Sequence, residues 1–233
     1  MVETAMEPTG APKKYQRQQR NNDPDQSRAD ILEAAEVQFA KRGYAGTTID
    51  SIAAKTRRSK RMVYYYFNSK STLYVAVLEN AYARIRAAEA NVNLTEDDPR
   101  QSLKNLVNFC FDFHFEHPTY VKLIMSENLN DAKYLNASSL VGELHRPIIQ
   151  RIEQCLRLGY QMELFHQNIS PVELHTTLSG LCFFNVSNRA TFSAIFDVDM
   201  ASAAARRARK QQILLTILGR LNTVMDGFVS DFT

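Results

Sequence analysis

The residues from Arg57 to Lys70, RRSKRMVYYYFNSK, combine five basic side chains with four consecutive aromatic ones and contain no acid. A buried helix could not hold these charges, because they would lack partners. An ordinary solvated helix face fits poorly as well, because the run from Tyr64 to Phe67 covers every direction of a helical turn. A short helix with one side in a small core and the other against a polyanion uses all of these residue types. With the short helix TTIDSIAAKT before it, the stretch is typical of a helix-turn-helix that reads DNA.

Local signals predict how this pair of helices begins and which residues meet the duplex. Thr48 is placed to cap the first helix and Ser59 the second. The expected inward residues are Ile49, Ile52 and Ala53 in the first helix and Met62, Val63 and Tyr66 in the second. Backbone amides at the second helix start suit phosphate oxygens, and Lys60 and Arg61 in its first turn suit guanine O6 and N7. The predicted DNA-binding residues are Thr48, Arg57, Arg58, Ser59, Lys60, Arg61, Tyr64, Tyr65 and Lys70.

Four sequence pieces surround this unit between about Ala29 and Ile85: AxxxFxxxGYxxTT, IAxxT, SKxxxYYYFxSK and LYxAVLE. Their order and spacing resemble those of TetR-type (TetR/AcrR) bacterial transcriptional regulators. The resemblance implies an all-α fold, with an N-terminal three-helix helix-turn-helix DNA-binding domain and a larger C-terminal helical domain for ligand binding and dimerisation. One departure is plain: the family usually has Gly and then an apolar residue in the turn, where this chain has Arg57 and Arg58. That difference predicts a turn of another shape, because a non-Gly residue at positive φ costs about 1 kcal/mol.

Composition agrees with a globular DNA-binding protein. The chain has 233 residues, 45% of them hydrophobic and 23% charged, which is ordinary for a globular protein with ample core. Residues 1–70 hold 13 Lys or Arg against 8 Asp or Glu, whereas the other 163 hold 15 against 17. The basic excess therefore coincides with the inferred DNA-binding unit. With neither a membrane span nor the apolar core of a signal peptide, the chain is expected in the cytoplasm, away from membranes.

The helical pattern divides the chain into three parts. Residues 1–26 are polar and predicted to be disordered, either as a basic arm along the duplex or as a solubilising leader. Residues 27–70 form the DNA-binding domain, with a first helix over 27–42 that ends at Gly43. Residues 71–233 form the ligand-binding and dimerisation domain, joined to the first by a long helix over 69–90 that acts as a lever. The remaining helices are expected at 99–116, 118–129, 137–158, 171–196 and 202–228, the third of them kinked or split at Pro147 and closed by Gly159.

The last two helices are apolar over so wide an arc that they must be covered on more than one side. Either they are central in a monomer or they pair with a second chain. The resemblance implies the second arrangement, a homodimer through a four-helix interface. Two half-sites on the DNA also favour a dimer.

The middle helices are where the resemblance places a small-molecule pocket. They carry many phenylalanines and a few polar groups, the usual makeup of a ligand site, although each of these residues could equally be core. Arg189 stands out, because a buried Arg needs a partner; an acidic ligand, an Asp or Glu, or solvent would serve. The predicted ligand-binding residues are Phe109, Phe113, His145, Phe165, His175, Asn185, Asn188 and Arg189, and the expected effector is aromatic or acidic.

Nothing in the sequence indicates catalysis, a metal or a cofactor. GxSxG, P-loop, GxGxxG and HExxH signatures are missing, and the carboxylates are scattered over helix exteriors. His114 and His117 have the only metal-like spacing, but Pro118 starts a new element directly after them. The three cysteines are scattered and are expected to be buried thiols rather than disulfides.

The sequence thus predicts a homodimeric, sequence-specific DNA-binding transcriptional regulator that binds a double-stranded operator. In the preferred hypothesis it is a repressor that a small-molecule effector releases from that operator. In the alternative it has the same fold without an inducer and answers to a protein partner.

Overall fold

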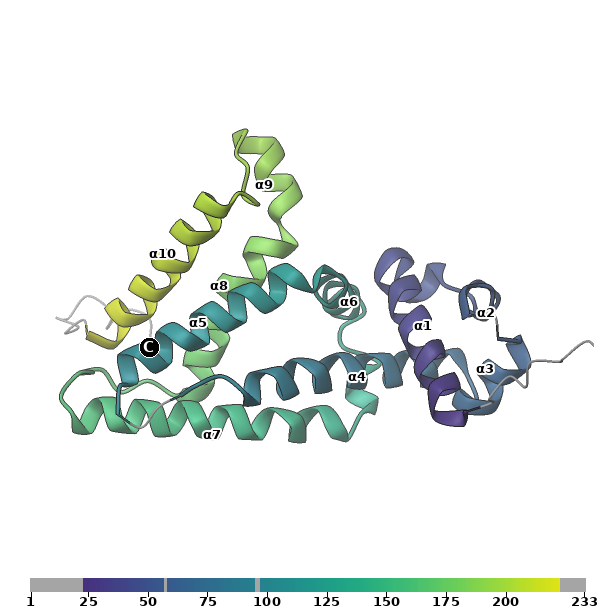
Figure 1. Ribbon diagram of the computed structural model, residues 1–233, viewed down its shortest axis with the longest axis horizontal. Helices are drawn as coiled ribbons and strands as arrows, with labels where there is room; N and C mark the ends of the chain where they lie inside the picture. Colours follow the sequence, from purple (N-terminus) through teal and green to yellow (C-terminus); the bar gives the residue numbers. More distant parts are fainter. Residues whose placement is uncertain (1–22, 57, 95–96, 223–233) are drawn as a thin grey trace, which may run out of the picture.

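A computed structural model describes residues 23–56, 58–94 and 97–222. Within these ranges the chain is all-α, as the sequence predicts, and has no strand. The helices are α1 (Pro24–Gly46), α2 (Ile49–Thr56), α3 (Lys60–Phe67), α4 (Lys70–Ala90), α5 (Pro99–Glu116), α6 (Pro118–Asn128), α7 (Leu140–Gln161), α8 (Pro171–Ser187), α9 (Arg189–Phe196) and α10 (Ala203–Asn222), with a 3-10 turn η1 (Leu135–Ala137). We call α1–α3 the head and α5–α10 the body; α4 joins them (Figure 1).

The helices α2 and α3 of the head begin at the positions that their capping residues predict. Thr48 Oγ1 accepts the N–H of Ser51 at 3.1 Å, and Ser59 Oγ accepts the N–H of Met62 at 3.3 Å, so both predicted caps are confirmed. Gly43, with φ 66°, interrupts α1 at the predicted helix end. The first helix begins earlier than predicted, because Asp23 caps it and Pro24 fits its first position.

The inward faces of the head largely match the expected ones. Ile49, Ile52 and Ala53 are buried, and so is Val63 of α3. Met62 and Tyr66 are only half-buried, and Phe67 is buried in their stead. The core side of α3 therefore lies along Val63 and Phe67, which are four residues apart and share one helix face.

Helix α4 runs from the head into the body, as its length predicts (Figure 1). In its second half, Arg84 forms an ion pair with Glu36 of α1 at 2.6 Å. At its far end, Arg151 of α7 donates to the backbone carbonyls of Glu89, Ala90 and Val92. Glu89 and Ala90 belong to the last turn of α4, whose carbonyls lack a full set of helical partners, and Val92 follows it directly, so Arg151 fixes the end of α4 to the body.

Head and body share one hydrophobic core. Tyr120, Val121 and Leu123 of α6 are buried in the same cluster as Ile31 and Phe39 of α1. At one edge of this cluster the aromatic rings of Phe39, Tyr44, Tyr74 and Tyr134 pack together, with centroid separations of 4.3 to 6.2 Å. A displacement of α6 therefore displaces α1 as well, because close-packed interiors transmit displacement.

The body has a second core between α5, α7, α8 and α10. Two of its predicted helices differ from the expectation. Helix α7 passes through Pro147 and beyond Gly159 to Gln161; Pro147 is exposed, so water can satisfy the carbonyl that its missing N–H leaves free. The helix expected at 171–196 breaks into α8 and α9 at Asn188. Just before the break, Ser187 Oγ donates to the Phe184 carbonyl at 3.5 Å, and Ser and Asn favour helix ends because their side chains compete for backbone hydrogen bonds.

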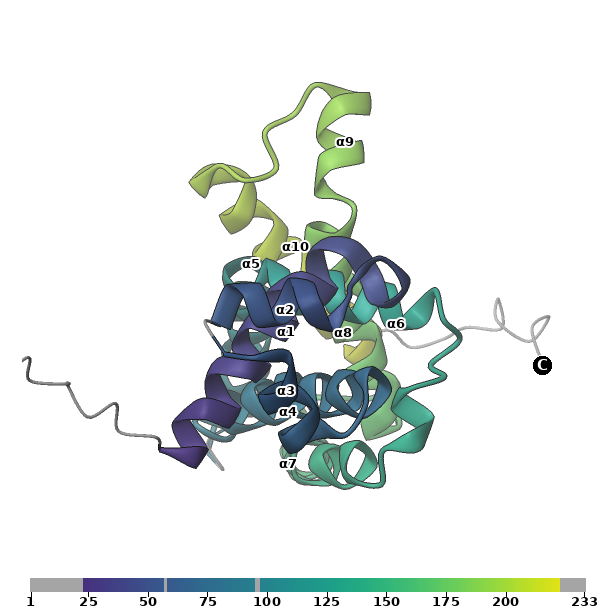
Figure 2. The same ribbon diagram turned by 90° about the vertical axis from the view of Figure 1, so that its right-hand side faces the viewer.

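The tip of the body around α9 projects away from its other helices (Figures 1 and 2). Figures 1 and 2 show α9 and the turn that follows it at the tip of a V formed by α8, α9 and α10. Helix α10 begins at Ala203, close to the expected start, and the predicted residues 223–228 lie outside the described part, as do residues 1–22 of the expected arm.

The substitution Gly159→Ala is expected to destabilise the protein by about 1–3 kcal/mol. A Cβ at this position would lie 1.9 Å from Cδ2 of the buried Phe165 ring, which would have to move. Gly142→Ala, on the same helix, is the matched control, because a Cβ there meets nothing within 4 Å; it should be neutral or stabilising by up to about 1 kcal/mol. Urea unfolding of both variants measures the difference, and equal stabilities would contradict this packing.

Candidate DNA-binding surface and ligand cavity

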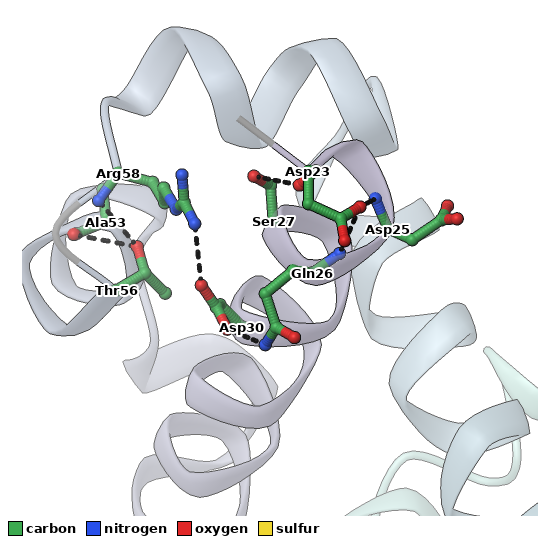
Figure 3. A network of polar contacts seen from close by, with 8 residues as sticks. All are labelled: Asp23, Asp25, Gln26, Ser27, Asp30, Ala53, Thr56 and Arg58. Atoms are coloured by element: carbon green, nitrogen blue, oxygen red, sulfur yellow. Dashed lines mark hydrogen bonds and ion pairs between the residues drawn. The ribbon is translucent and has the colours of Figure 1, made fainter. Parts of the chain in front are cut away.

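An ion pair fixes the turn between α2 and α3. Arg58 reaches back to α1, where its Nη2 lies 2.9 Å from Oδ2 of Asp30 (Figure 3). Its backbone N–H donates to Thr56 Oγ1 at 3.2 Å, and Gln26 donates to the other oxygen of Asp30. Hydrogen bonds from Gln26 and Arg58 lower the pKa of Asp30. Arg58, a predicted DNA-binding residue, thus has an intramolecular partner that braces the turn.

The outer face of α3 carries basic and aromatic groups, as predicted. Tyr65 is 74% and Tyr64 43% exposed, and Arg61 is exposed. Lys60 lies 2.9 Å from Asp50 of α2, and that hydrogen bond raises the pKa of the lysine. The side chains of Lys60 and Asp50 are 50% and 69% exposed, so their ion pair adds little stability. A phosphate or a base edge could replace Asp50 as the partner of Lys60.

Three further predicted DNA-binding residues lie at the starts of α2, α3 and α4. Thr48 and Ser59 cap α2 and α3, beside the free backbone N–H groups of each first turn. Lys70 begins α4, with its ammonium 4.3 Å from the centroid of the Tyr44 ring, and burial lowers its pKa. Arg57 lies outside the described residues.

A cavity of about 650 Å³ lies in the body between α4, α5, α6, α7 and α8. Of the predicted ligand-binding residues, Phe109, His145 and His175 line it, together with His114, Asn128 and Phe183 from the same apolar stretches. The volume is in the range of small-molecule sites, and the lining has the aromatic and polar mixture that they use.

The other predicted ligand-binding residues are not among those that line this cavity. Phe113 is buried nearby, stacked on His117 at 4.1 Å. Phe165 packs against Gly159 at the far end of α7, and Asn185 is buried within α8. Asn188 and Arg189 occupy the break between α8 and α9, where the Arg189 guanidinium lies 5.3 Å from the Phe115 ring. Phe115 and the protein surface thus accommodate this arginine, which is half-buried.

Helix α4 supplies part of the cavity wall, although none of the predicted ligand-binding residues lies on it. Tyr82, Arg86 and Glu89 line the wall, at spacings of four and three that place them on one helix face. This periodicity is the sequence signal for a shared face. It does not by itself indicate a cavity, because charged residues on a long connecting helix are usually solvated.

Arg86 and Glu89 form the most buried ion pair among the described residues. Arg86 Nη1 lies 2.6 Å from Glu89 Oε2, and the two side chains are 11% and 6% exposed. Burial raises the pKa of Glu89 to about 7, although Arg86 and Arg151 act against it. Burial and the nearby Arg86 lower the pKa of His175 to about 4, and burial lowers that of His145. Both imidazoles are therefore neutral at physiological pH.

His114 and His117 do not form a metal site with other groups in the described part of the chain, where no cluster of three or more His, Cys, Asp or Glu could hold an ion. Each uses Nδ1 to donate to the carbonyl four residues before it. The three cysteines are buried free thiols, as expected. No helix in the described ranges is both long and apolar enough to cross a membrane.

Two family models match the chain. Residues 31–77 match the bacterial regulatory proteins of the tetR family, and residues 99–217 match the tetracyclin repressor-like C-terminal domain. Among curated relatives, the HTH-type transcriptional repressor NicS of Pseudomonas putida is 34% identical over 182 residues, which are 78% of this chain and 86% of the relative. The HTH-type transcriptional repressor SCO4008 of Streptomyces coelicolor is 33% identical over 107 residues, which are 46% of this chain and 52% of that protein.

Solved structures have the same fold. The putative transcriptional regulator SCO4942 from Streptomyces coelicolor superposes with a TM-score of 0.62 at 26% identity, over 80% of this chain and 96% of that one. A tetR-family regulatory protein from Rhodococcus RHA1 has a TM-score of 0.65 at 16% identity, over 85% and 98% of the two chains, and supports the fold alone. These relatives are transcriptional regulators rather than enzymes, as the sequence led us to expect. Both halves of the chain match, so the protein belongs to the TetR family of bacterial transcriptional regulators.

Proposed function

We propose that this regulator is a homodimeric repressor that binds operator DNA through α3 and leaves it when a small molecule occupies the body cavity. The observation that carries the DNA-binding part is the two-sided character of α3. Val63 and Phe67 are buried in the head, while Lys60, Arg61, Tyr64 and Tyr65 are exposed, with Arg61 and Tyr65 on the side of the helix away from the buried pair. Such a regulator acts where bacterial DNA lies, in the cytoplasm.

The geometry of α3 suits the major groove. Its N-terminus carries Lys60 and Arg61, and the first turn of a recognition helix is the part that reaches base edges. The tyrosine hydroxyls and the free amides at Ser59 suit the flanking phosphates. Arg58 holds the turn on α1 through Asp30, so the helix is presented on a rigid support.

Dimerisation is expected through α8 and α10. Phe184 of α8 and Leu215 of α10 are exposed apolar residues on helices that are otherwise packed into the body, and Leu181, Leu214 and Leu218 beside them are half-buried. A second copy that covered these residues would bury apolar area and set the distance between the two α3 helices.

The cavity favours control by a small molecule over control by a protein partner. Its walls include α4 and α6, and both helices also pack in the head core through residues such as Val77 and Leu123. A ligand that fits better when these helices are displaced would shift the head by its difference in affinity between the two arrangements. A closed and fully packed body would have favoured the protein-partner alternative.

Arg61→Ala should reduce operator affinity by about 1–3 kcal/mol and relax the preference for one base pair, because a base contact is lost. Lys60→Ala should do the same at a neighbouring position. Selection of bound duplexes from random DNA, followed by binding titrations at fixed salt, measures both effects. Lys104→Ala, an exposed lysine on α5, is the control and should leave affinity and preference unchanged. Unaltered base preference in both head variants would remove the base-reading role of α3.

Leu215→Glu should turn the dimer into a monomer, because the charge would be buried against the second copy. Leu215 is 60% exposed in the single chain, so the fold itself should tolerate the change. Sedimentation velocity measures the mass, and Leu129→Glu, at a residue 86% exposed beyond α6, provides the control. A Leu215→Glu protein that sediments as a dimer would place the interface elsewhere.

A further inference from the structure

The Arg86–Glu89 pair lies in the wall of the cavity rather than on the surface. Both side chains line the cavity and are almost fully buried. The Nε–H of Arg86 is buried and has no hydrogen-bond partner among the described residues. A buried donor of a charged group left without a partner is costly, by about 1–3 kcal/mol or more. Arg86 therefore has unused capacity to donate where a ligand would bind.

The imidazoles around Arg86 are fixed in defined tautomers by their neighbours. Arg86 Nη1, which can only donate, lies 3.4 Å from His175 Nε2, so this weak contact leaves the proton of neutral His175 on Nδ1. His145 donates from Nδ1 to the Val141 carbonyl at 2.8 Å, so its Nε2 is an acceptor. The cavity thus combines a cationic donor with neutral rings, and aromatic side chains such as Phe109 and Tyr82 complete its walls.

The charge that acts inside the cavity is positive. Burial is the first cause of the lowered pKa of His175, and Arg86 is the second. Burial likewise outweighs the two arginines at Glu89, whose carboxyl has a pKa of about 7 and is readily neutralised. When Glu89 is protonated, Arg86 keeps its charge without an anionic partner. A ligand carboxylate would restore that partner, because it has the same geometry as the group it replaces.

We propose that the effector is a small aromatic carboxylate, whose carboxylate displaces that of Glu89 from Arg86 while the ring packs among the aromatic side chains of the cavity. This assignment rests on the proposed function, since it names the ligand class of the same site. Exchange at Arg86 also links the ligand to α4, because Glu89 lies in the last turn of that helix, next to the carbonyls that Arg151 holds.

The exchange takes up a proton. Once Arg86 binds the ligand, Glu89 loses its nearest cation and faces a second anion, so it becomes neutral. The other groups around it are Arg151 and His145 of α7, His114 and Cys110 of α5, Tyr120 of α6 and His175 of α8. Arg151 stays with the α4 carbonyls, and burial raises the pKa of Tyr120. Burial lowers the pKa of both His145 and His175, so these two imidazoles are neutral in the pH range above 7 where Glu89 is ionised in the free protein. His114 differs: burial lowers its pKa, but hydrogen bonds with Cys110 outweigh this and raise it.

The first experiment measures ligand class. Isothermal titration calorimetry of the full-length dimer is run at pH 7 with benzoate, 4-hydroxybenzoate and 1-naphthoate, with their primary amides, and with octanoate. At least one aromatic acid should bind at least tenfold more tightly than its amide and than octanoate. Equal affinity for an acid and its amide, a preference for octanoate, or no binding by any aromatic acid would overturn the proposal.

The second experiment assigns the anchor. Arg86→Gln should weaken the bound acid at least tenfold and leave the affinity for the amide within about twofold. The double variant Arg86→Gln with Glu89→Gln removes both buried charges, so it tests the same loss if the single variant fails to fold. Arg157→Gln, an exposed arginine on α7, is the matched control and should bind the acid like the natural protein. Full acid affinity without Arg86 would contradict the proposed contact.

The third experiment tests the proton. Because Glu89 is ionised in the free protein above pH 7 and neutral in the complex, acid affinity should be constant below about pH 6 and fall about tenfold per pH unit above pH 8. Glu89→Gln should abolish this fall and bind the acid about tenfold more tightly at pH 8. A fall that persists in Glu89→Gln would come from another group, such as His114, and would overturn the exchange.

Operator binding of the same preparation is measured first, with and without each acid. A protein that holds operator DNA and is released by an uncharged compound, but by no acid, overturns the carboxylate assignment alone. A protein that binds no duplex selectively overturns the proposed regulator instead.

Discussion

The packing of α6 against α1 is the contact on which the rest of the structure depends. It places residues of the body, such as Tyr120 and Leu123, in the same core as the helix that supports the DNA-reading pair. Because cores are packed at the density of organic crystals, the two parts cannot move independently across this contact. Helix α4 adds a second connection, held at Glu36 on one side and at Arg151 on the other. The head is thus supported at two places, and both supports have surfaces in the cavity.

Two buried charges lie in the cavity wall, where an apolar core would ordinarily exclude them. Arg86 and Glu89 lie on the cavity side of α4, and the price of their burial is reduced by their pairing and by the neutral state available to Glu89. Structural pairs such as Arg84–Glu36 and Lys210–Asp112 are more exposed and lie away from the cavity. Burial and position thus distinguish the pair that a ligand could use from the pairs that only connect helices. Arg58–Asp30 is another pair that connects helices. It links the turn after α2 to α1 in a chain that has Arg57 where the family usually has glycine.

The head was predictable from the sequence because its signals are local. Caps at Thr48 and Ser59, the glycine at 43 and the apolar spacing of α2 each depend on residues within one or two helical turns. The body helices were also found, but the break at Asn188 and the continuation of α7 past Gly159 were not, because such residues can either end a helix or lie within it, and the surrounding packing decides which. The cavity was predicted only in part. Phe109, His145 and His175 line it. Phe165 and Arg189 do not, because Phe165 packs beside Gly159 and Arg189 lies against the Phe115 ring. Tertiary contacts decide which aromatic residues line the cavity and which are packed in the core, and composition cannot distinguish the two groups.

In the proposed regulator, two copies of α3 enter the major groove on one face of the duplex. Hydroxyl-radical and methylation footprinting of a selected operator tests this arrangement most directly. We expect two protected major-groove patches related by symmetry, with centres about 34–36 Å or a multiple of that apart along the helix axis. A single patch, or protection spread evenly along the duplex, would contradict it.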